Sequence, residues 1–236
     1  MGLFQDRLVV DGDRQRLRSE GTAVPDLIAR LEAGELPAAL VRTGAMAPAD
    51  VVAALASHAL GGDDSLGLPL VQAKPRWPRL ERALSEPAWV AVFPGVASRS
   101  RLTLSAGLLQ VYDFWDASHE AAQKADDLGE REFSAYWHGI AHRREPDESN
   151  SAYWFRRVGR HPLFTPLANA ARPLLDQPGD ASLRERLISG GAWNPSTMID
   201  LCTKVERGTP RESLARRLQR LEMWLLLEAT FAAIVS

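Results

Sequence analysis

The chain has 236 residues, of which 45% are hydrophobic and 25% charged, a composition typical of a folded globular protein with one domain or two small ones. Its 28 basic and 30 acidic residues give a formal net charge of −2, so no overall field draws it to nucleic acid or to a membrane surface. The single cysteine, Cys202, excludes an internal disulfide and a metal site built from several cysteines.

The first residues, MGLFQDRLVV, reach charged side chains early and contain no apolar signal-peptide core, so we expect a protein of the cytoplasm. Proline is favoured at the first position of a helix, and Pro25 and Pro48 therefore predict helices over 25–33 and 48–60. Residues 61–78 contain three prolines and three glycines without any periodicity, which is typical of a long loop.

Three consecutive helices are expected in the middle of the chain, each closed by a stop signal. The stop signals are Gly129, Pro146 and Gly159, and the helices run over 100–127, 131–145 and 148–158. Before them, the apolar run 89–93 fits either a short strand or a buried helical turn.

Capping boxes mark the C-terminal helices, because a Ser or Thr with a Glu three residues later satisfies two amide groups at a helix N-terminus. The boxes at 182–185 and 209–212 predict a short helix that ends at the glycine pair 190–191 and a long amphipathic helix. A third helix is expected to begin at Asn194-Pro195 and to reach Gly208.

The last helix, over 210–235, becomes strongly apolar toward its end. Its apolar stretch 223–235 is shorter than the ~20 residues that a membrane span needs, and Glu228 interrupts it. We therefore expect no membrane contact, and the apolar face suits either the core or a homodimer interface.

The sequence lacks convincing alternating strands, so the expected fold class is all-α. We expect an irregular helical bundle with long loops and room for one short hairpin or strand pair. A single domain over 1–236 would combine a looser N-terminal helical half, 1–98, with a compact bundle, 99–236, that carries the functional site.

Side chains able to do chemistry near neutral pH are concentrated between residues 112 and 162. This window holds four of the five histidines, all three tyrosines and three tryptophans. They are His119, His138, His142, His161, Tyr112, Tyr136, Tyr153, Trp115, Trp137 and Trp154. The flanking segments are rich in Ala, Leu, Val, Arg and Glu, which is typical of a scaffold. A functional site is therefore expected within this window.

Two histidines in the helix predicted over 131–145 indicate the centre of that site. Residues four apart lie on one face of a helix, so His138 and His142 share a face, to which Glu145 returns one turn later. Two imidazoles and a carboxylate suit a divalent transition metal, or an acid–base group with its orienting partner.

The preceding helix offers partners for these imidazoles. Because the connection between the two helices is short, we expect them to be antiparallel neighbours, which would bring Asp116 and His119 opposite the two imidazoles. The expected catalytic residues are His138, His142, Asp116 and His119, and the expected metal ligands are His138, His142, Glu145 and Asp116. The alternative is a set of core histidines whose polar atoms are satisfied by aspartates.

Arginines and aromatic residues around this helix indicate a place for a small polar or anionic substrate, because guanidinium groups bind carboxylates and phosphates and also stack on rings. The expected contacts are Tyr153, Arg157, Arg143 and Trp137. Two alternatives stay open: the arginines pair with nearby acids, and the aromatic rings belong to the core.

These residues leave two functions open. The first is an enzyme that acts on a small molecule at a histidine/carboxylate centre, where a transition metal would polarise a carbonyl, activate water or handle oxygen. The alternative is a non-catalytic helical binding or assembly module, in which the same His, Asp and Arg side chains form a buried polar network that fixes the register of the helices.

The segment AYWHGIAHRREPD-x-SN-x-AYWFRRVGRHP resembles one in a family of uncharacterised bacterial and fungal proteins. Those proteins also carry a D-x-S-H-x-x-x-Q helix upstream, which Asp116, Ser118, His119 and Gln123 match here. The resemblance covers residues 112–162, about a fifth of the chain. It implies that this window is a distinctive unit and implies no particular reaction.

Overall fold

The computed structural model of the chain describes residues 2–11, 14–18, 21–42, 44, 46–61, 66–176 and 180–236. The described residues are 67% helical and form twelve α-helices and two small two-stranded sheets. The predicted fold class, an irregular all-α bundle with a short strand pair, is confirmed. None of the helices in these ranges combines the length and the apolar character of a membrane span.

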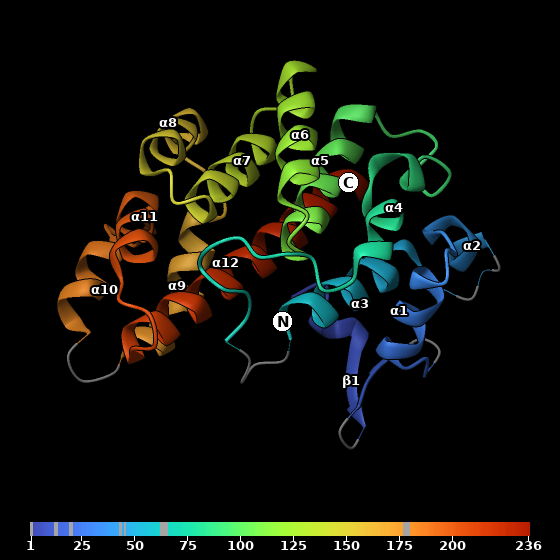
Figure 1. Cartoon of the computed structure of the whole chain (residues 1–236), viewed down its shortest axis with the longest axis horizontal. Helices are drawn as coiled ribbons and strands as arrows, with labels where there is room; N and C mark the ends of the chain where they lie inside the picture. The colour runs from blue at the N-terminus through green and yellow to red at the C-terminus, as the bar shows by residue number, and fades with distance from the viewer. Residues whose placement is uncertain are drawn as a thin grey trace.

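The N-terminal half begins with an antiparallel hairpin at the lower edge of the molecule in Figure 1. The hairpin follows a short turn, η1 (Gln5–Arg7), and consists of the strands β1 (Leu8–Asp11) and β2 (Arg14–Leu17). Three helices come next: α1 (Val24–Glu32), α2 (Pro37–Arg42) and α3 (Pro48–Leu60). The helices predicted at Pro25 and Pro48 are confirmed. Each proline lies in the first turn, where its missing amide hydrogen removes no intrahelical bond.

The predicted long loop is confirmed where it is described, since residues 66–77 contain no helix or strand. Short elements follow it: η2 (Pro78–Leu80), α4 (Glu81–Leu84) and η3 (Glu86–Trp89). Of the two readings of the run 89–93, the structure has the helical turn. Trp89 and Phe93 are buried, and the Phe93 amide donates a hydrogen bond to the Trp89 carbonyl oxygen (2.9 Å).

The single helix predicted over 100–127 is wrong, because the chain turns back in the middle of it. The helices α5 (Ser98–Val111) and α6 (Trp115–Asp127) pack against each other across a short break. At the break Asp113 has a φ of +64°, a conformation that aspartate tolerates better than most residues. Its carboxylate accepts a hydrogen bond from Arg144 Nη2 (2.5 Å), and this distant contact stabilises the turn.

Three helices follow the α5–α6 pair: α7 (Phe133–Arg144), α8 (Glu148–Val158) and α9 (Phe164–Leu175). α8 has the predicted bounds. Asp147 caps it by accepting a hydrogen bond from the Asn150 amide, and Gly159 follows its last residue with a φ of +62°. α7 is slightly shorter than the prediction at both ends, and α9 was not predicted.

The C-terminal elements are α10 (Ala181–Leu187), β3 (Ile188–Ser189), β4 (Ala192–Trp193), α11 (Pro195–Lys204) and α12 (Pro210–Val235). The long last helix is confirmed, and so is its hydroxyl cap, because Thr209 Oγ1 accepts a hydrogen bond from the Glu212 amide (3.2 Å). The Glu212 carboxylate, however, accepts from the amide of Gly208 instead of that of Thr209 (2.6 Å).

Three details of this region differ from the prediction. The box at 182–185 does not cap a helix, since α10 begins at Ala181 without a side-chain cap. The glycine pair 190–191 forms the turn between β3 and β4, where both residues have positive φ. α11 ends at Lys204, before the predicted stop at Gly208.

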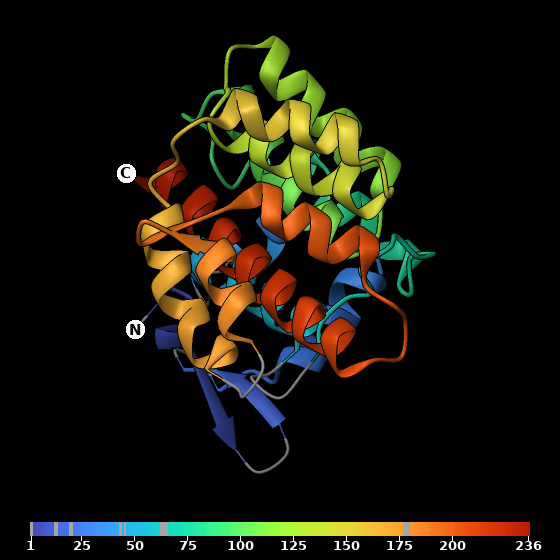
Figure 2. The same cartoon turned by 90° about the vertical axis from the view of Figure 1, so that its left-hand side faces the viewer.

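One continuous cluster of buried hydrophobic side chains extends from Phe4 to Phe231 and joins both halves of the chain. α12 runs diagonally through the molecule and packs against α3, α5, α9 and α11 (Figure 1). α6, α7 and α8 lie together on one side of α12 (Figure 2). A buried ion pair between Arg143 of α7 and Glu222 of α12 (2.6 Å) ties this layer to the centre of the molecule.

Candidate functional site

Three histidines from two neighbouring helices meet in the layer formed by α6, α7 and α8. His119 lies on α6, and His138 and His142 lie one turn apart on α7. The ring centroids are 4.3 Å apart for His119 and His138, 5.1 Å for His119 and His142, and 5.0 Å for His138 and His142. One ligand atom of each histidine lies within 4.8 Å of the other two. We call these residues the three-histidine group.

Two indole rings enclose the three-histidine group. Trp154 of α8 stacks on His138 with a centroid distance of 3.8 Å and an interplanar angle of 15°. Trp115 of α6 stacks on His119 at 5.0 Å and 23°. The Nε1–H of Trp115 donates a hydrogen bond to the Ala141 carbonyl oxygen (2.8 Å), which fixes this ring against α7. The indoles therefore restrict how the imidazole rings can turn.

Burial keeps the imidazoles of His138 and His119 neutral. His138 is 1% exposed and His142 is 8% exposed, while His119 is partly exposed and forms the open side. Burial, together with the nearby charges of His119, His142 and Arg157, lowers the pKa of His138 to about 3. Burial, and then His142, also lowers the pKa of His119. At neutral pH both rings therefore keep a lone pair, and a neutral imidazole is the form that binds a metal.

One nitrogen of the group is buried without a partner. His138 Nδ1 makes no hydrogen bond to any residue that the structure describes. A buried polar atom that stays unpaired costs about 1–3 kcal/mol. A metal ion or a water molecule bound among the imidazoles would remove that cost.

Carboxylates lie at the edge of the three-histidine group. Glu145 Oε2 is 2.9 Å from His142 Nδ1, and the Glu145 side chain is 38% exposed. Asp116, predicted as a catalytic residue and as a ligand, is exposed and lies outside the group of converging ligand atoms. The structure thus brings His119, and not Asp116, next to His138 and His142.

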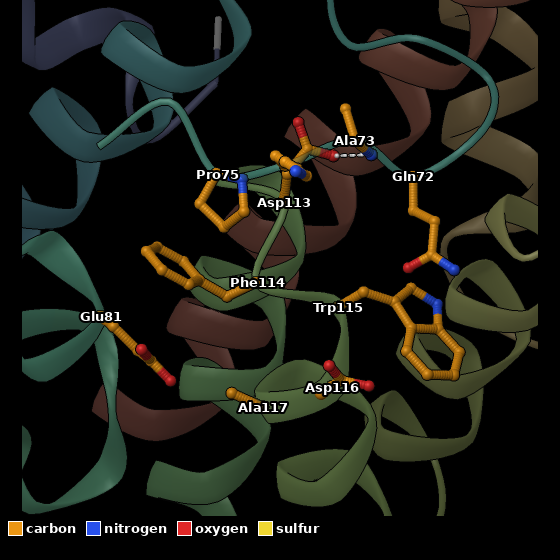
Figure 3. Close-up of a pocket in the computed structure, with 10 residues that line it drawn as sticks. Gln72, Ala73, Pro75, Glu81, Asp113, Phe114, Trp115, Asp116 and Ala117 are labelled. Carbon is orange, nitrogen blue, oxygen red and sulfur yellow. Dashed lines mark hydrogen bonds between the residues drawn. The ribbon is translucent and has the colours of Figure 1, made fainter. Parts of the chain in front are cut away.

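A cavity of about 490 Å³ opens beside Trp115 (Figure 3). Its walls are the loop residues 72–75, the end of the α5–α6 break with the first turn of α6 (113–117), and the side chain of Glu81. Trp115 lines this cavity and also stacks on His119, so the cavity and the three-histidine group share a wall.

Two of the four residues expected to bind a substrate lie in the interior. The Arg143 side chain is 0% exposed, and its Nη2 lies 2.6 Å from Glu222 Oε2. Trp137 is fully buried as well, and its Nε1–H donates a hydrogen bond to Thr230 Oγ1 (3.1 Å). Neither side chain has surface that a substrate could reach, so the prediction that Arg143 and Trp137 contact a substrate does not fit the structure.

The other two expected substrate contacts lie near Trp154 at the surface. Arg157 Nη2 is 2.9 Å from both carboxylate oxygens of Asp126, and its guanidinium lies over the Trp154 ring at 5.1 Å. Tyr153 is 45% exposed. The charge of Arg157 is therefore paired with an acid, but this acid is Asp126 and not one of the nearby acids Glu145, Asp147 and Glu148 that the sequence offered as an alternative.

Sequence reasoning missed the two indoles as parts of the site. Trp115 precedes His119 by four residues and so shares its face of α6, a signal that the spacing contained. Trp154 reaches His138 from the next helix, and no regular spacing relates the two residues.

No family model, no curated protein and no solved structure matches the chain.

Proposed function

We propose that the chain is an enzyme that acts on a small molecule at a metal centre held by His119, His138 and His142. The observation that carries the proposal is the convergence of their ligand atoms within 4.8 Å of one another. A metal bonded to imidazole nitrogens at about 2.0–2.1 Å keeps any two of them within about 4.2 Å, so small rotations of the rings are enough to close the site.

The ligand set indicates the kind of chemistry. Imidazole nitrogens suit a divalent transition metal such as zinc, copper, iron or nickel. Three protein ligands leave a coordination position for water or substrate, which is typical of catalytic zinc sites and not of structural ones. A metal in this position would polarise a carbonyl group or activate a water molecule.

Glu145 adds a second argument for a metal. A carboxylate that accepts the proton of one ring nitrogen fixes the tautomer of a metal-binding histidine and makes it a better ligand. Glu145 Oε2 lies 2.9 Å from His142 Nδ1, so Nε2 is the nitrogen that keeps its lone pair for the ion.

The second candidate is the non-catalytic helical module, which the polar network beneath the site favours. Arg143 and Arg144 are fully buried on α7 and pair with Glu222 and Asp113. Buried pairs of this kind add little stability over apolar residues of similar size, and in some proteins they fix how elements pack. In this function the imidazoles belong to the network and bind no metal.

Metal analysis of the full chain, purified without a histidine tag, distinguishes the two functions. After equilibration with zinc we expect at least one tightly bound ion per chain. His138→Ala/His142→Ala should lose far more than the roughly 100-fold in affinity that removing an orienting partner alone can cost. His161→Gln is the control, because His161 is buried but lies outside the group, and it should bind like the wild type. If the wild-type protein bound no stoichiometric metal, that result would contradict the metal-dependent enzyme and support the non-catalytic module.

His138→Leu should separate metal binding from stability. Leucine replaces a buried ring whose Nδ1 is unpaired within the described residues, so the metal-free variant should gain about 1 kcal/mol in free energy of unfolding while it loses the metal. Urea unfolding of both metal-free proteins measures the difference. A loss of about 2 kcal/mol or more, as for a cavity in a packed core, would mean that His138 serves the fold itself.

A further inference from the structure

A second group of ligands lies directly outside the three-histidine group and shares His142 with it. One ligand atom each of His142, Glu145 and Asp147 lies within 4.8 Å of the other two. The two groups differ in exposure. His138 in the inner group is 1% exposed, whereas Glu145 is exposed and Asp147 partly exposed. The outer group therefore lies on the solvent side of the shared histidine.

The end of α7 holds both carboxylates near the His142 ring. The Glu145 amide donates hydrogen bonds to the carbonyl oxygens of Ala141 (3.0 Å) and His142 (3.2 Å), and the Asp147 amide donates to that of His142 (2.9 Å). The Asp147 carboxylate in turn accepts a hydrogen bond from the Asn150 amide at the start of α8 (3.0 Å). The backbone of both residues and the Asp147 carboxylate are thus ordered before any ligand binds, which lowers the entropic cost of binding.

The two nitrogens of the His142 ring can serve one group each. Its Nδ1 lies 2.9 Å from Glu145 Oε2, so the outer carboxylates lie on the Nδ1 side of the ring. Nε2, on the other edge of the ring, is the nitrogen left for an ion held with His119 and His138. An imidazole that loses its Nδ1 proton binds one metal ion through each nitrogen.

We infer that His142, Glu145 and Asp147 form a second metal site, so that the centre holds two divalent transition-metal ions joined through the His142 ring. This inference rests on the proposed function, which supplies the inner ion. The outer ion takes the place of the Nδ1 proton, which leaves to solvent, and is bonded to one nitrogen and two carboxylate oxygens. Its remaining positions suit water or an oxygen atom of an anionic substrate. Arg143 and Arg157, which the sequence predicted as contacts for an anionic substrate, are not available to bind one, because each is paired with an acid.

Titration of the metal-free full chain with cobalt(II), followed by visible absorption and by calorimetry, counts the sites. We expect two ions per chain, the second bound more weakly than the first. Asp147→Ser should reduce the count to one, because it removes the carboxylate while the serine hydroxyl can still cap α8. The control is Asp200→Ser, which removes an exposed carboxylate from α11 and should still bind two ions.

The outcomes separate this inference from the proposed function. One ion in both the wild type and Asp147→Ser overturns the second site and leaves the inner site, and the proposed function, in place. Two ions in both proteins overturn the assignment of the outer ion to Asp147. No ion in the wild type contradicts the proposed function, and the second site falls with it.

Discussion

Glu222→Leu should lower the free energy of unfolding by about 3–5 kcal/mol, because it leaves a buried charge without its partner. Arg143 Nη2 lies 2.6 Å from Glu222 Oε2, and both side chains are 0% exposed. Burial alone would lower the pKa of Arg143, but the Glu222 carboxylate raises it above its usual value, so the guanidinium stays charged. The variant also removes the acceptor of the Tyr136 hydroxyl, which donates to Glu222 Oε1 (3.0 Å). Urea unfolding measures the loss.

A second variant keeps this prediction testable if Glu222→Leu does not fold. Arg143→Met/Glu222→Gln removes both buried charges, and the new amide oxygen can still accept from the Tyr136 hydroxyl. We expect this protein to lie within about 1–2 kcal/mol of the wild type, because removing both charges leaves no buried charge without a partner. A double variant as unstable as Glu222→Leu would show that packing, and not the unpaired charge, causes the loss.

The spacing of the histidines was enough to predict much of the site's geometry, and the exact boundaries of the helices mattered less. His138 and His142 share a face because of local helix geometry alone, which the sequence contains completely. The approach of His119 follows from the packing of consecutive helices across a short connection. The wrong prediction of one helix over 100–127 did not affect this expectation. The C-terminal part of that range, which is followed by α7, is α6 in the structure.

The choice between Asp116 and His119 could not be made from the sequence. The two residues are three apart on α6, about 60° around the helix, so the rotation of α6 about its own axis decides which of them faces α7. That rotation depends on contacts with other elements. One of them is the hydroxyl of Ser118, which is buried and donates a hydrogen bond to the Ala106 carbonyl oxygen of α5 (2.8 Å).

The break at Asp113 and the partner of Arg143 were missed for a common reason. The sequence around each offers a local solution: a helical pattern that continues past Asp113, and acids such as Glu145 close to Arg143. The structure uses residues distant in sequence, Arg144 for the break and Glu222 for the arginine. Burial explains the second case, because a guanidinium inside the protein pairs with a carboxylate that is buried with it, while Glu145 is exposed.

The metal-free protein should lose stability steeply between about pH 6.5 and pH 4, because two buried histidines resist protonation. Burial, with the charges around it, lowers the pKa of His138 to about 3, and burial lowers that of His161 to about 4. Both return to about 6.5 in the unfolded chain. At pH 5 the unfolded chain therefore holds about two more protons at these residues than the folded protein does. Wherever the unfolded state binds more protons, the free energy of unfolding decreases as the pH decreases.

The pH dependence of the urea unfolding free energy near pH 5 measures this proton difference, and His138→Leu assigns it. The variant should take up about one proton fewer on unfolding than the wild type, because only His161 of the pair remains. His161 is unchanged in the variant, so its proton uptake cancels in the comparison. Saturating zinc opposes protonation of His138 and not of His161, so it should extend the stability of the wild type to lower pH more than it extends that of His138→Leu. Equal proton uptake in the two proteins would mean that the pKa of His138 is the same in the folded protein and in the unfolded chain. That result would contradict the pKa shift expected from the burial of His138 against Trp154.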